Sequence, residues 1–259
     1  MTSGLAIQVG SIARRQIVRT LRQPAAVFFP VVFPLTLMAV NAGGLTPATR
    51  LPGFPTDSFY AFALAVPFIQ GALFATMNAG TDLARDIQDG FFNRLALTPL
   101  SSVGLLVGLL AGVVTLGLAQ AVIYLGVGLA IGVDFQAGVP GMLVVLALAA
   151  LILLAFGAIG ATAALRTGSG EAVQGLFPAF FVFLFISSMN MPRDLIPIDW
   201  FRIAATANPV SYLLEGVRSL IITGWDAEAL ALGFGVAVAL TIAALVAAAM
   251  SMKTRMERT

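Results

Sequence analysis

The sequence predicts an all-α integral membrane protein that forms a single domain over residues 1–259 and crosses the bilayer with six helices. The first reason is composition: 59% of the residues are hydrophobic and 10% charged, against about 45–50% and about 25% in a soluble domain. The second is that apolar residues gather into runs of the roughly 20 residues that a membrane helix needs. The third is that cysteine and histidine are absent, which excludes disulfides, zinc sites and Ser-His-Asp hydrolysis. We therefore expect no catalytic residue and no metal site.

Residues 1–23 are expected to form an amphipathic helix at the membrane surface. Helical spacing places Arg15, Arg19 and Arg22 together, opposite an apolar side that includes Ile12 and Ile17. A basic face of this kind suits an anionic bilayer surface. The alternative is a secretory signal, because basic residues precede an apolar run, but that run has span length and further spans follow it. A retained interfacial helix is therefore favoured.

Six segments have the length of a membrane span, and they cover residues 24–44, 58–80, 100–132, 138–165, 172–191 and 226–252. Pro30 and Pro34 predict a kinked first span, whose freed carbonyls neighbouring helices must satisfy. In the third span, Gly104, Gly108 and Gly112 recur every four residues and predict close packing against another helix.

The distribution of positive charge predicts the orientation of the spans. Six spans place both termini on one side, and cytoplasmic loops of membrane proteins are rich in Lys and Arg. If both termini are cytoplasmic, only Arg50, Arg193, Arg202 and Arg218 fall outside. The other ten of the 14 basic residues lie inside: Arg14, Arg15, Arg19, Arg22, Arg85, Arg94, Arg166, Lys253, Arg255 and Arg258. We expect a multi-pass protein of the cell membrane with both termini cytoplasmic and, since topology explains the basic residues, no nucleic-acid partner.

A charged stretch, residues 82–99, separates the second and third spans and falls on the cytoplasmic side. Its sequence, DLARDIQDGFFNRLALTP, gives an amphipathic pattern when drawn as one helix. The apolar stripe is Leu83, Ile87, Phe91 and Leu95, and the opposite face carries Asp82, Asp86, Asp89 and Asn93. We therefore predict a surface helix that offers its acidic face to a partner in water.

Residues 192–224 form a second informative region, on the outer side between the fifth and sixth spans. Residues 210–223 predict an apolar helix of about 14 residues, too short to span the bilayer. An external loop is the alternative, but it would expose several leucine and isoleucine side chains, so a re-entrant helical hairpin is favoured. Glu215 and Arg218 are three residues apart and are expected to pair on this helix.

Together these features resemble the membrane subunit of type-2 ATP-binding-cassette exporters, the permease family that includes daunorubicin-resistance permeases and lipopolysaccharide or nodulation-factor exporters. The likeness covers essentially the whole chain. It rests on six spans, a basic amino-terminal helix, a second inner loop of sequence RTGSGEAVQ and two motifs. The inner motif is Asp86, Gly90, Leu95, Leu97, Thr98 and Pro99, and the outer motif is Asn208, Pro209, Tyr212, Glu215 and Arg218.

The resemblance implies that residues 82–99 are a coupling helix that contacts a separate ATPase subunit. The residues implied in ATPase coupling are Asp82, Arg85, Asp86, Asp89, Gly90, Arg94, Thr98 and Pro99. It further implies two ATPase copies, which hold ATP and Mg²⁺, and a second permease copy or paralogue. The chain itself has no phosphate-binding loop, because its one lysine, Lys253, follows AAAMSM rather than a glycine-rich turn. The family usually carries a glutamate near the start of the coupling helix, where this chain has the shorter Asp86 and Asp89.

The implied function is export by alternating access, with the outer hairpin as a gate and a substrate route bordered by the second and fifth spans. The candidate lining residues are Phe68, Phe74, Asn78, Phe177 and Phe181. The aliphatic and phenylalanine-rich spans favour a small amphipathic or hydrophobic substrate such as a drug, an antibiotic or a lipid-like molecule. Export of a polysaccharide or glycolipid, ion-driven secondary transport and an intramembrane enzyme remain alternatives.

Overall fold

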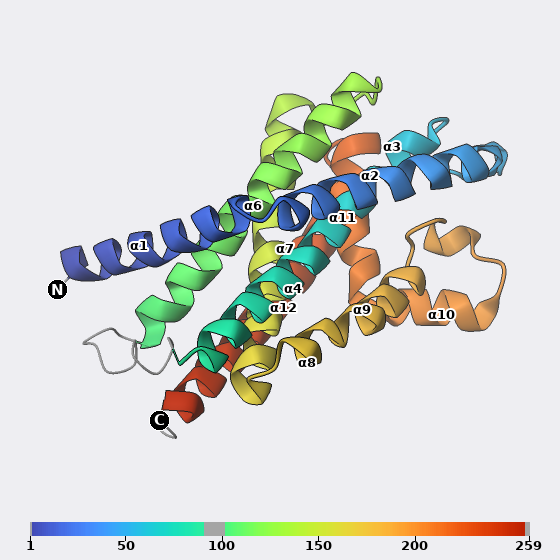
Figure 1. The fold of residues 1–259 in the computed structure, drawn as a ribbon. Coiled ribbons are helices and arrows are strands. Elements are labelled where there is room, and N and C mark those ends of the chain that lie inside the picture. The colour runs from blue at the N-terminus through green and yellow to red at the C-terminus, as the bar shows by residue number, and fades with distance from the viewer. Residues whose placement is uncertain (1, 91–101, 257–259) are drawn as a thin grey trace.

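The computed structural model describes residues 2–90 and 102–256, and these residues form helices and their connections. Figure 1 shows a bundle with α4 and α7 at its centre and α12 packed against α7. The helices are α1 (Thr2–Leu21), α2 (Pro24–Leu45), η1 (Thr46–Arg50), α3 (Phe59–Ala63), α4 (Ala65–Gln88), α6 (Ser102–Ala130), α7 (Gly138–Thr167), α8 (Gly170–Gln174), α9 (Leu176–Phe185), η2 (Arg193–Leu195), α10 (Asp199–Ala207), α11 (Pro209–Ile222) and α12 (Ala227–Met256).

Within the described residues, five helical segments are long and apolar enough to cross a membrane. They are Pro24–Arg50, Phe59–Gln88, Gly104–Ala130, Gly138–Thr167 and Ala227–Met256. These segments match five of the six predicted spans, so the chain is a multi-pass helical membrane protein.

The predicted fifth span, residues 172–191, is wrong as a single spanning helix. The helical part is Gly170–Phe185, which is shorter than a span and divided at Gly175, and the chain leaves the helix at Ile186. Main-chain carbonyls freed by this break are satisfied by the residue that caps α11, since Asn208 donates to the carbonyl oxygens of Phe183 (2.6 Å) and Ile186 (2.7 Å). The helix can stop here because its polar groups are paired inside the protein.

The bundle has two distinct ends. At the first, which we call the basic end, α4, α7 and α12 finish together. Gln88 donates to the carbonyl oxygen of Gly168 (3.0 Å) and Arg166 to the hydroxyl of Ser251 (3.1 Å). At the second, the hairpin end, α11 meets the start of α4 and the connection between α6 and α7. Figure 1 shows both chain ends on the side opposite α10.

Close helix contacts follow from small residues and prolines, as the sequence predicts. A Cβ placed on Gly108 would lie 2.8 Å from Cβ of Ile12, and one on Gly112 would lie 2.8 Å from Cβ of Gln16, so α1 packs along this glycine face of α6. In α2, Pro34 cannot donate to the carbonyl of Pro30, and the Tyr124 hydroxyl from α6 donates to it instead. The predicted glycine packing and carbonyl satisfaction are thereby confirmed. The placement of α1 at a bilayer surface stays a prediction.

Candidate functional site

The charged stretch begins inside α4, so the expectation that a separate helix starts at Asp82 is wrong, while residues 91–99 of the predicted helix lie outside the described residues. Residues 82–88 form the last two turns of α4, which ends where Asp89 caps it and Gly90 takes a φ of +66°. Gly80 does not end the helix; it allows α4 to approach α7, because a Cβ there would lie 2.8 Å from the carbonyl oxygen of Gly160. Arg94, Thr98 and Pro99 lie outside the described residues.

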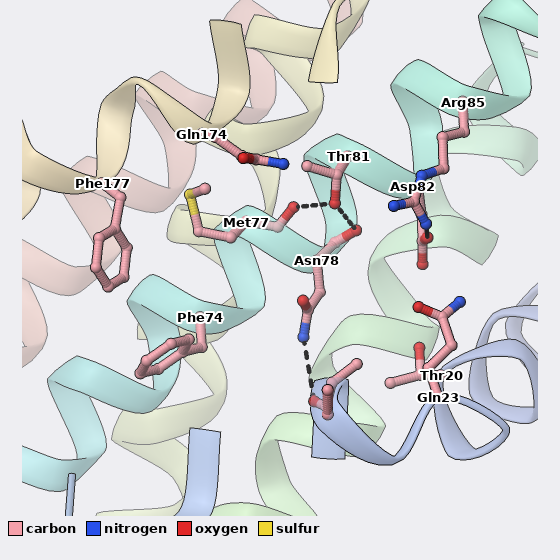
Figure 2. Close-up of a pocket in the computed structure, with 12 residues that line it drawn as sticks. Thr20, Gln23, Phe74, Met77, Asn78, Thr81, Asp82, Arg85, Gln174 and Phe177 are labelled. Atoms are coloured by element: carbon pink, nitrogen blue, oxygen red, sulfur yellow. Dashed lines mark hydrogen bonds and ion pairs between the residues drawn. The ribbon is translucent and has the colours of Figure 1, made fainter. Parts of the chain in front are cut away.

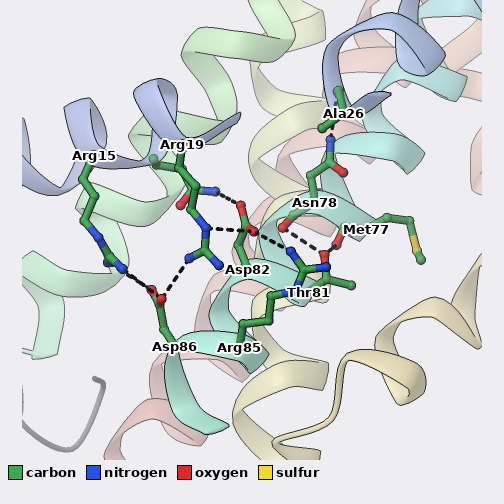
Figure 3. A network of polar contacts seen from close by, with 10 residues as sticks. Arg15, Arg19, Ala26, Met77, Asn78, Thr81, Asp82, Arg85 and Asp86 are labelled. Carbon is green, nitrogen blue, oxygen red and sulfur yellow. Dashed lines mark hydrogen bonds and ion pairs between the residues drawn. The ribbon is translucent and has the colours of Figure 1, made fainter. Parts of the chain in front are cut away.

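Two acidic residues of this segment, Asp82 and Asp86, are bound by α1 instead of facing a partner in water. Arg15 donates two hydrogen bonds to the Asp86 carboxylate (2.9 and 3.0 Å), and Arg19 donates a third (2.9 Å). Asp82 is 5% exposed and accepts from Gln16 (2.8 Å), with Arg19 Nε at 3.4 Å. Figure 3 shows this network joining α1 to the end of α4.

This network corrects the expectation that Asp82 and Asp86 face a partner in water. Arg15 and Arg19 bind carboxylates in α4, and a contact of α1 with an anionic membrane surface stays a prediction. Asp82 and Asp86 are correspondingly engaged inside the chain. Asp89 is exposed at the end of α4 and remains available to a partner. The sequence could not reveal these pairs, since Arg15 and Asp86 are 71 positions apart.

Beside this network lies a cavity of about 490 Å³, open to the surface between the α1–α2 junction, α4 and the α8–α9 segment. It is lined by Thr20, Gln23, Ala25, Ala26, Phe74, Met77, Asn78, Thr81, Asp82, Arg85, Gln174 and Phe177. Figure 2 shows Phe74, Phe177 and Met77 toward one side and Thr20, Gln23, Asp82 and Arg85 toward the other, with Asn78 and Thr81 between them. The cavity is therefore amphipathic, and its volume suits a drug-sized ligand.

The predicted substrate-path residues divide between this cavity and the core. Phe74, Asn78 and Phe177 line the cavity, and Phe181 extends its aromatic side because its ring centre lies 4.6 Å from that of Phe177. Phe68 is instead buried against Tyr124 of α6, at 5.6 Å between ring centres.

Sequence reasoning missed several polar lining residues of the cavity. Thr20 lies in the last turn of α1 and Gln23 at the start of α2, where no pattern marks them. Gln174 was not selected as a lining residue, although a polar residue in an apolar segment either lines a route or bonds across helices, and here it lines the cavity. Arg85, expected at an ATPase contact, also lines the cavity.

At the hairpin end, the outer motif joins α11 to the broken α9. Asn208 accepts from the backbone N–H of Val210 (2.9 Å) and so caps α11, with Pro209 in the first turn where its missing N–H costs nothing. Arg218 is 5% exposed and donates to the carbonyl oxygens of Phe62 (2.9 Å), Ser188 (2.8 Å) and Met189 (2.8 Å). The predicted short helix in this region is confirmed.

The predicted pairing of Glu215 with Arg218 is wrong. Glu215 accepts two hydrogen bonds from Arg193 (2.8 and 2.6 Å), and the Arg193 guanidinium lies 4.4 Å from the ring centre of Tyr212. Partial burial opposes the charged form of Arg193, but the Glu215 carboxylate outweighs it and raises the pKa of Arg193. Arg218 binds main-chain carbonyls because its side chain extends from α11 to the end of α3 and to the segment that follows α9.

Within residues 2–90 and 102–256, the helical bundle with its five candidate spans defines a multi-pass membrane protein, and an amphipathic cavity opens beside α4. The chain belongs to the ABC-2 type transporter family, whose model matches residues 7–222.

Three relatives show the range of this likeness. The daunorubicin resistance ABC transporter permease protein DrrB1 of Streptomyces coeruleorubidus is 27% identical over 75% of this chain and 66% of its own length. A doxorubicin resistance ABC transporter permease protein, DrrC, of Mycobacterium tuberculosis is 27% identical over 61% of this chain and 58% of its own length. The protein named transport permease ycf38 of Pyropia yezoensis is 25% identical over 82% of this chain and 73% of its own length.

Proposed function

We propose that this chain is the membrane subunit of an ATP-driven exporter that moves small amphipathic or hydrophobic molecules out of the cytoplasm or inner leaflet. Family membership and the drug-resistance permeases among the relatives support an exporter powered by a separate ATP-binding-cassette ATPase. The observation that carries the proposal is the amphipathic cavity, because α4 lines it with Phe74 and Asn78 and also ends beside it at Asp89.

The geometry supports α4 as the link between the ATPase and the cavity. Movement imposed at Asp89 and Gly90 would be carried along one continuous helix to Asn78 and Phe74, about three to four turns away. The ion pairs to α1 tie that helix to the wall of the cavity formed by Thr20. Alternating access would follow if the ATPase moves α4 and α1 together relative to the α8–α9 segment.

The ATPase partner would hold ATP and Mg²⁺, and we place two copies of it on a pair of permease chains. Exposed aromatic residues of α2 and α9, such as Phe28, Phe29 and Phe183, give a lateral face that suits a second permease copy or a paralogue. Both described chain ends lie at the basic end, and Arg85, Arg166 and Lys253 lie there too. The positive-inside tendency therefore favours a cytoplasmic basic end in the cell membrane.

The coupling proposal is tested by reversing one exposed charge. Asp89→Lys should abolish substrate-stimulated ATP hydrolysis by the purified complex, because it places a cation where the partner is expected to meet an acid. Asp57→Lys is the matched control, since Asp57 is equally exposed but precedes α3 at the hairpin end. Both variants should be expressed and inserted as the unmodified chain is.

Two outcomes would count against the proposal. If substrate stimulates ATP hydrolysis as strongly in the Asp89→Lys complex as in the Asp57→Lys complex, the end of α4 is not the ATPase contact. Co-expression with the ATPase should also raise cellular resistance to amphipathic compounds, and an unchanged resistance profile would point to lipid or glycan export.

A further inference from the structure

We propose that the cavity selects amphipathic anions: an apolar or aromatic body lies against Phe74 and Phe177, and an anionic head group meets Arg85. This inference rests on the proposed export function and adds the charge of the substrate.

The first step is the charge balance of the ion-pair network beside the cavity. Arg15, Arg19 and Arg85 face Asp82 and Asp86, which leaves one positive charge in excess. Arg15 and Arg19 saturate Asp86 at 2.9–3.0 Å, and Arg19 with Gln16 holds Asp82.

The second step is that Arg85 carries the excess charge toward the cavity. Its guanidinium is 4.0 Å from the Asp82 carboxylate, at the limit of an ion pair, and its side chain is 54% exposed. A guanidinium presents several N–H donors in one plane, which matches a carboxylate, sulfonate or phosphate. Arg85 can therefore bind a head group without breaking the network between α1 and α4.

The third step is that a cationic head group would find no available carboxylate. Asp82 is the acidic residue lining the cavity, but it is buried and already accepts from Gln16 and lies within 3.4 Å of Arg19. A cation would have to displace Arg19 from a desolvated site while facing the repulsion of Arg85. The cavity thus disfavours cations even though an aspartate lies in its wall.

The opposite side of the cavity supplies the apolar contact. Phe74 and Phe177 lie 5.5 Å apart between ring centres, and Phe177 lies 4.6 Å from Phe181. These tilted rings suit edge or offset contact with an aromatic or aliphatic body. The aromatic rings and the arginine lie on different sides of the same cavity (Figure 2). A molecule that fills the cavity therefore needs an apolar part for one side and an anionic part for the other.

The test measures equilibrium binding to the purified full chain in phosphatidylcholine nanodiscs without the ATPase. Three dansyl probes share one alkyl chain and differ in head group: sulfonate, neutral amide or trimethylammonium. The sulfonate should bind about tenfold more tightly than the amide, and the trimethylammonium more weakly than either.

Variants assign the preference to particular side chains. Arg85→Gln should bring sulfonate binding close to amide binding and leave the amide unchanged, whereas Phe177→Ala should weaken all three probes by a similar factor. Arg50→Gln is the matched control, because Arg50 is an exposed arginine at the hairpin end. Equal binding of the three head groups, or a sulfonate preference that survives Arg85→Gln, would overturn the inference.

A second arm separates a membrane lipid from a soluble amphipathic anion as the source of the head group. Nanodiscs containing phosphatidylglycerol should leave sulfonate binding intact if the cavity takes soluble anions, and should suppress it if an anionic lipid occupies the cavity. Suppression would identify the amphipathic anion as the membrane lipid.

The inference and the proposed function fail in different ways. A sulfonate preference without transport by the complex would leave the inference standing and remove the exporter function. Transport by the complex without any head-group preference in binding would support the exporter function and overturn the inference.

Discussion

The two ends of the bundle hold arginine in opposite ways. At the basic end, Arg15 and Arg19 pair with carboxylates across two helices, and Arg15 is 44% exposed. At the hairpin end, Arg218 is buried, binds three main-chain carbonyls and stacks 3.6 Å from the ring centre of Phe62. The first arrangement is a contact between side chains that can open and reform. In the second arrangement, Arg218 supplies the hydrogen bonds that main-chain carbonyls lack where the helices are interrupted. This arrangement is therefore required for folding.

The largest expected effect is at Arg218. Arg218→Gln should destabilise the protein by about 3 kcal/mol or more, because several buried carbonyls lose their donor at once. Arg218→Lys should also be poorly folded, since an ammonium cannot span carbonyls from α3 and the end of α9 with the same planar set of donors. Thermal unfolding in detergent, followed by size-exclusion chromatography, measures the loss.

The control for Arg218 is Arg202→Gln, which removes an exposed arginine from the same end of the molecule. Equal melting temperatures for the Arg218 and Arg202 variants would mean that the carbonyl contacts contribute nothing, and the contrast between the two ends would disappear.

An intermediate effect is expected at Asp86. Asp86→Asn and Arg15→Gln should each lower stability, and the double variant should show a coupling of about 0.5–1 kcal/mol, because the pair is only partly buried. The coupling should shrink in high salt, whereas the effect of Arg218→Gln should not. Melting temperatures at low and high ionic strength provide both quantities.

Asp89→Asn serves as the neighbouring control, because Asp89 is exposed at the end of the same helix. A double-variant coupling near zero at low salt would show that the bonds between α1 and α4 do not stabilise the bundle.

The smallest effect is expected from exchanging Arg193 and Glu215. The double variant Arg193→Glu with Glu215→Arg keeps one charge of each sign at these positions, which are 21% and 24% exposed. Its stability should lie within about 1 kcal/mol of the unmodified chain, while each single variant should be less stable than the double. Unfolding curves of the three variants check this order, and a double variant less stable than both singles would contradict it.

The sequence predicted the helices with long apolar runs, since composition and length decide them. It also predicted the short helix α11, from the apolar run over residues 210–223. It failed at the fifth span, because the Ser-Ser-Met-Asn stretch carries no strong breaker and the helix stops where distant Asn208 and Arg218 satisfy its carbonyls.

For the site, helical spacing placed Asp82 and Asp86 on one face, and the structure has them together. Spacing could not identify what they bind, because Arg15 and Arg19 lie 71 and 67 positions before Asp86. Phe74, Asn78 and Phe177 were selected from the resemblance and line the cavity, but the contribution of Thr20 and Gln23 depends on how α1 turns into α2.

The packing of α1 against the glycine face of α6 has a consequence for biosynthesis. α1 is synthesised before the residues that it binds, around Asp86 and Gly108–Gly112. At a synthesis rate of about 5–20 residues per second, these residues follow α1 by roughly 4–20 seconds. Ile12→Cys and Gly108→Cys should therefore crosslink only in nascent chains long enough for α6 to have emerged, which makes docking of α1 a late step in membrane assembly.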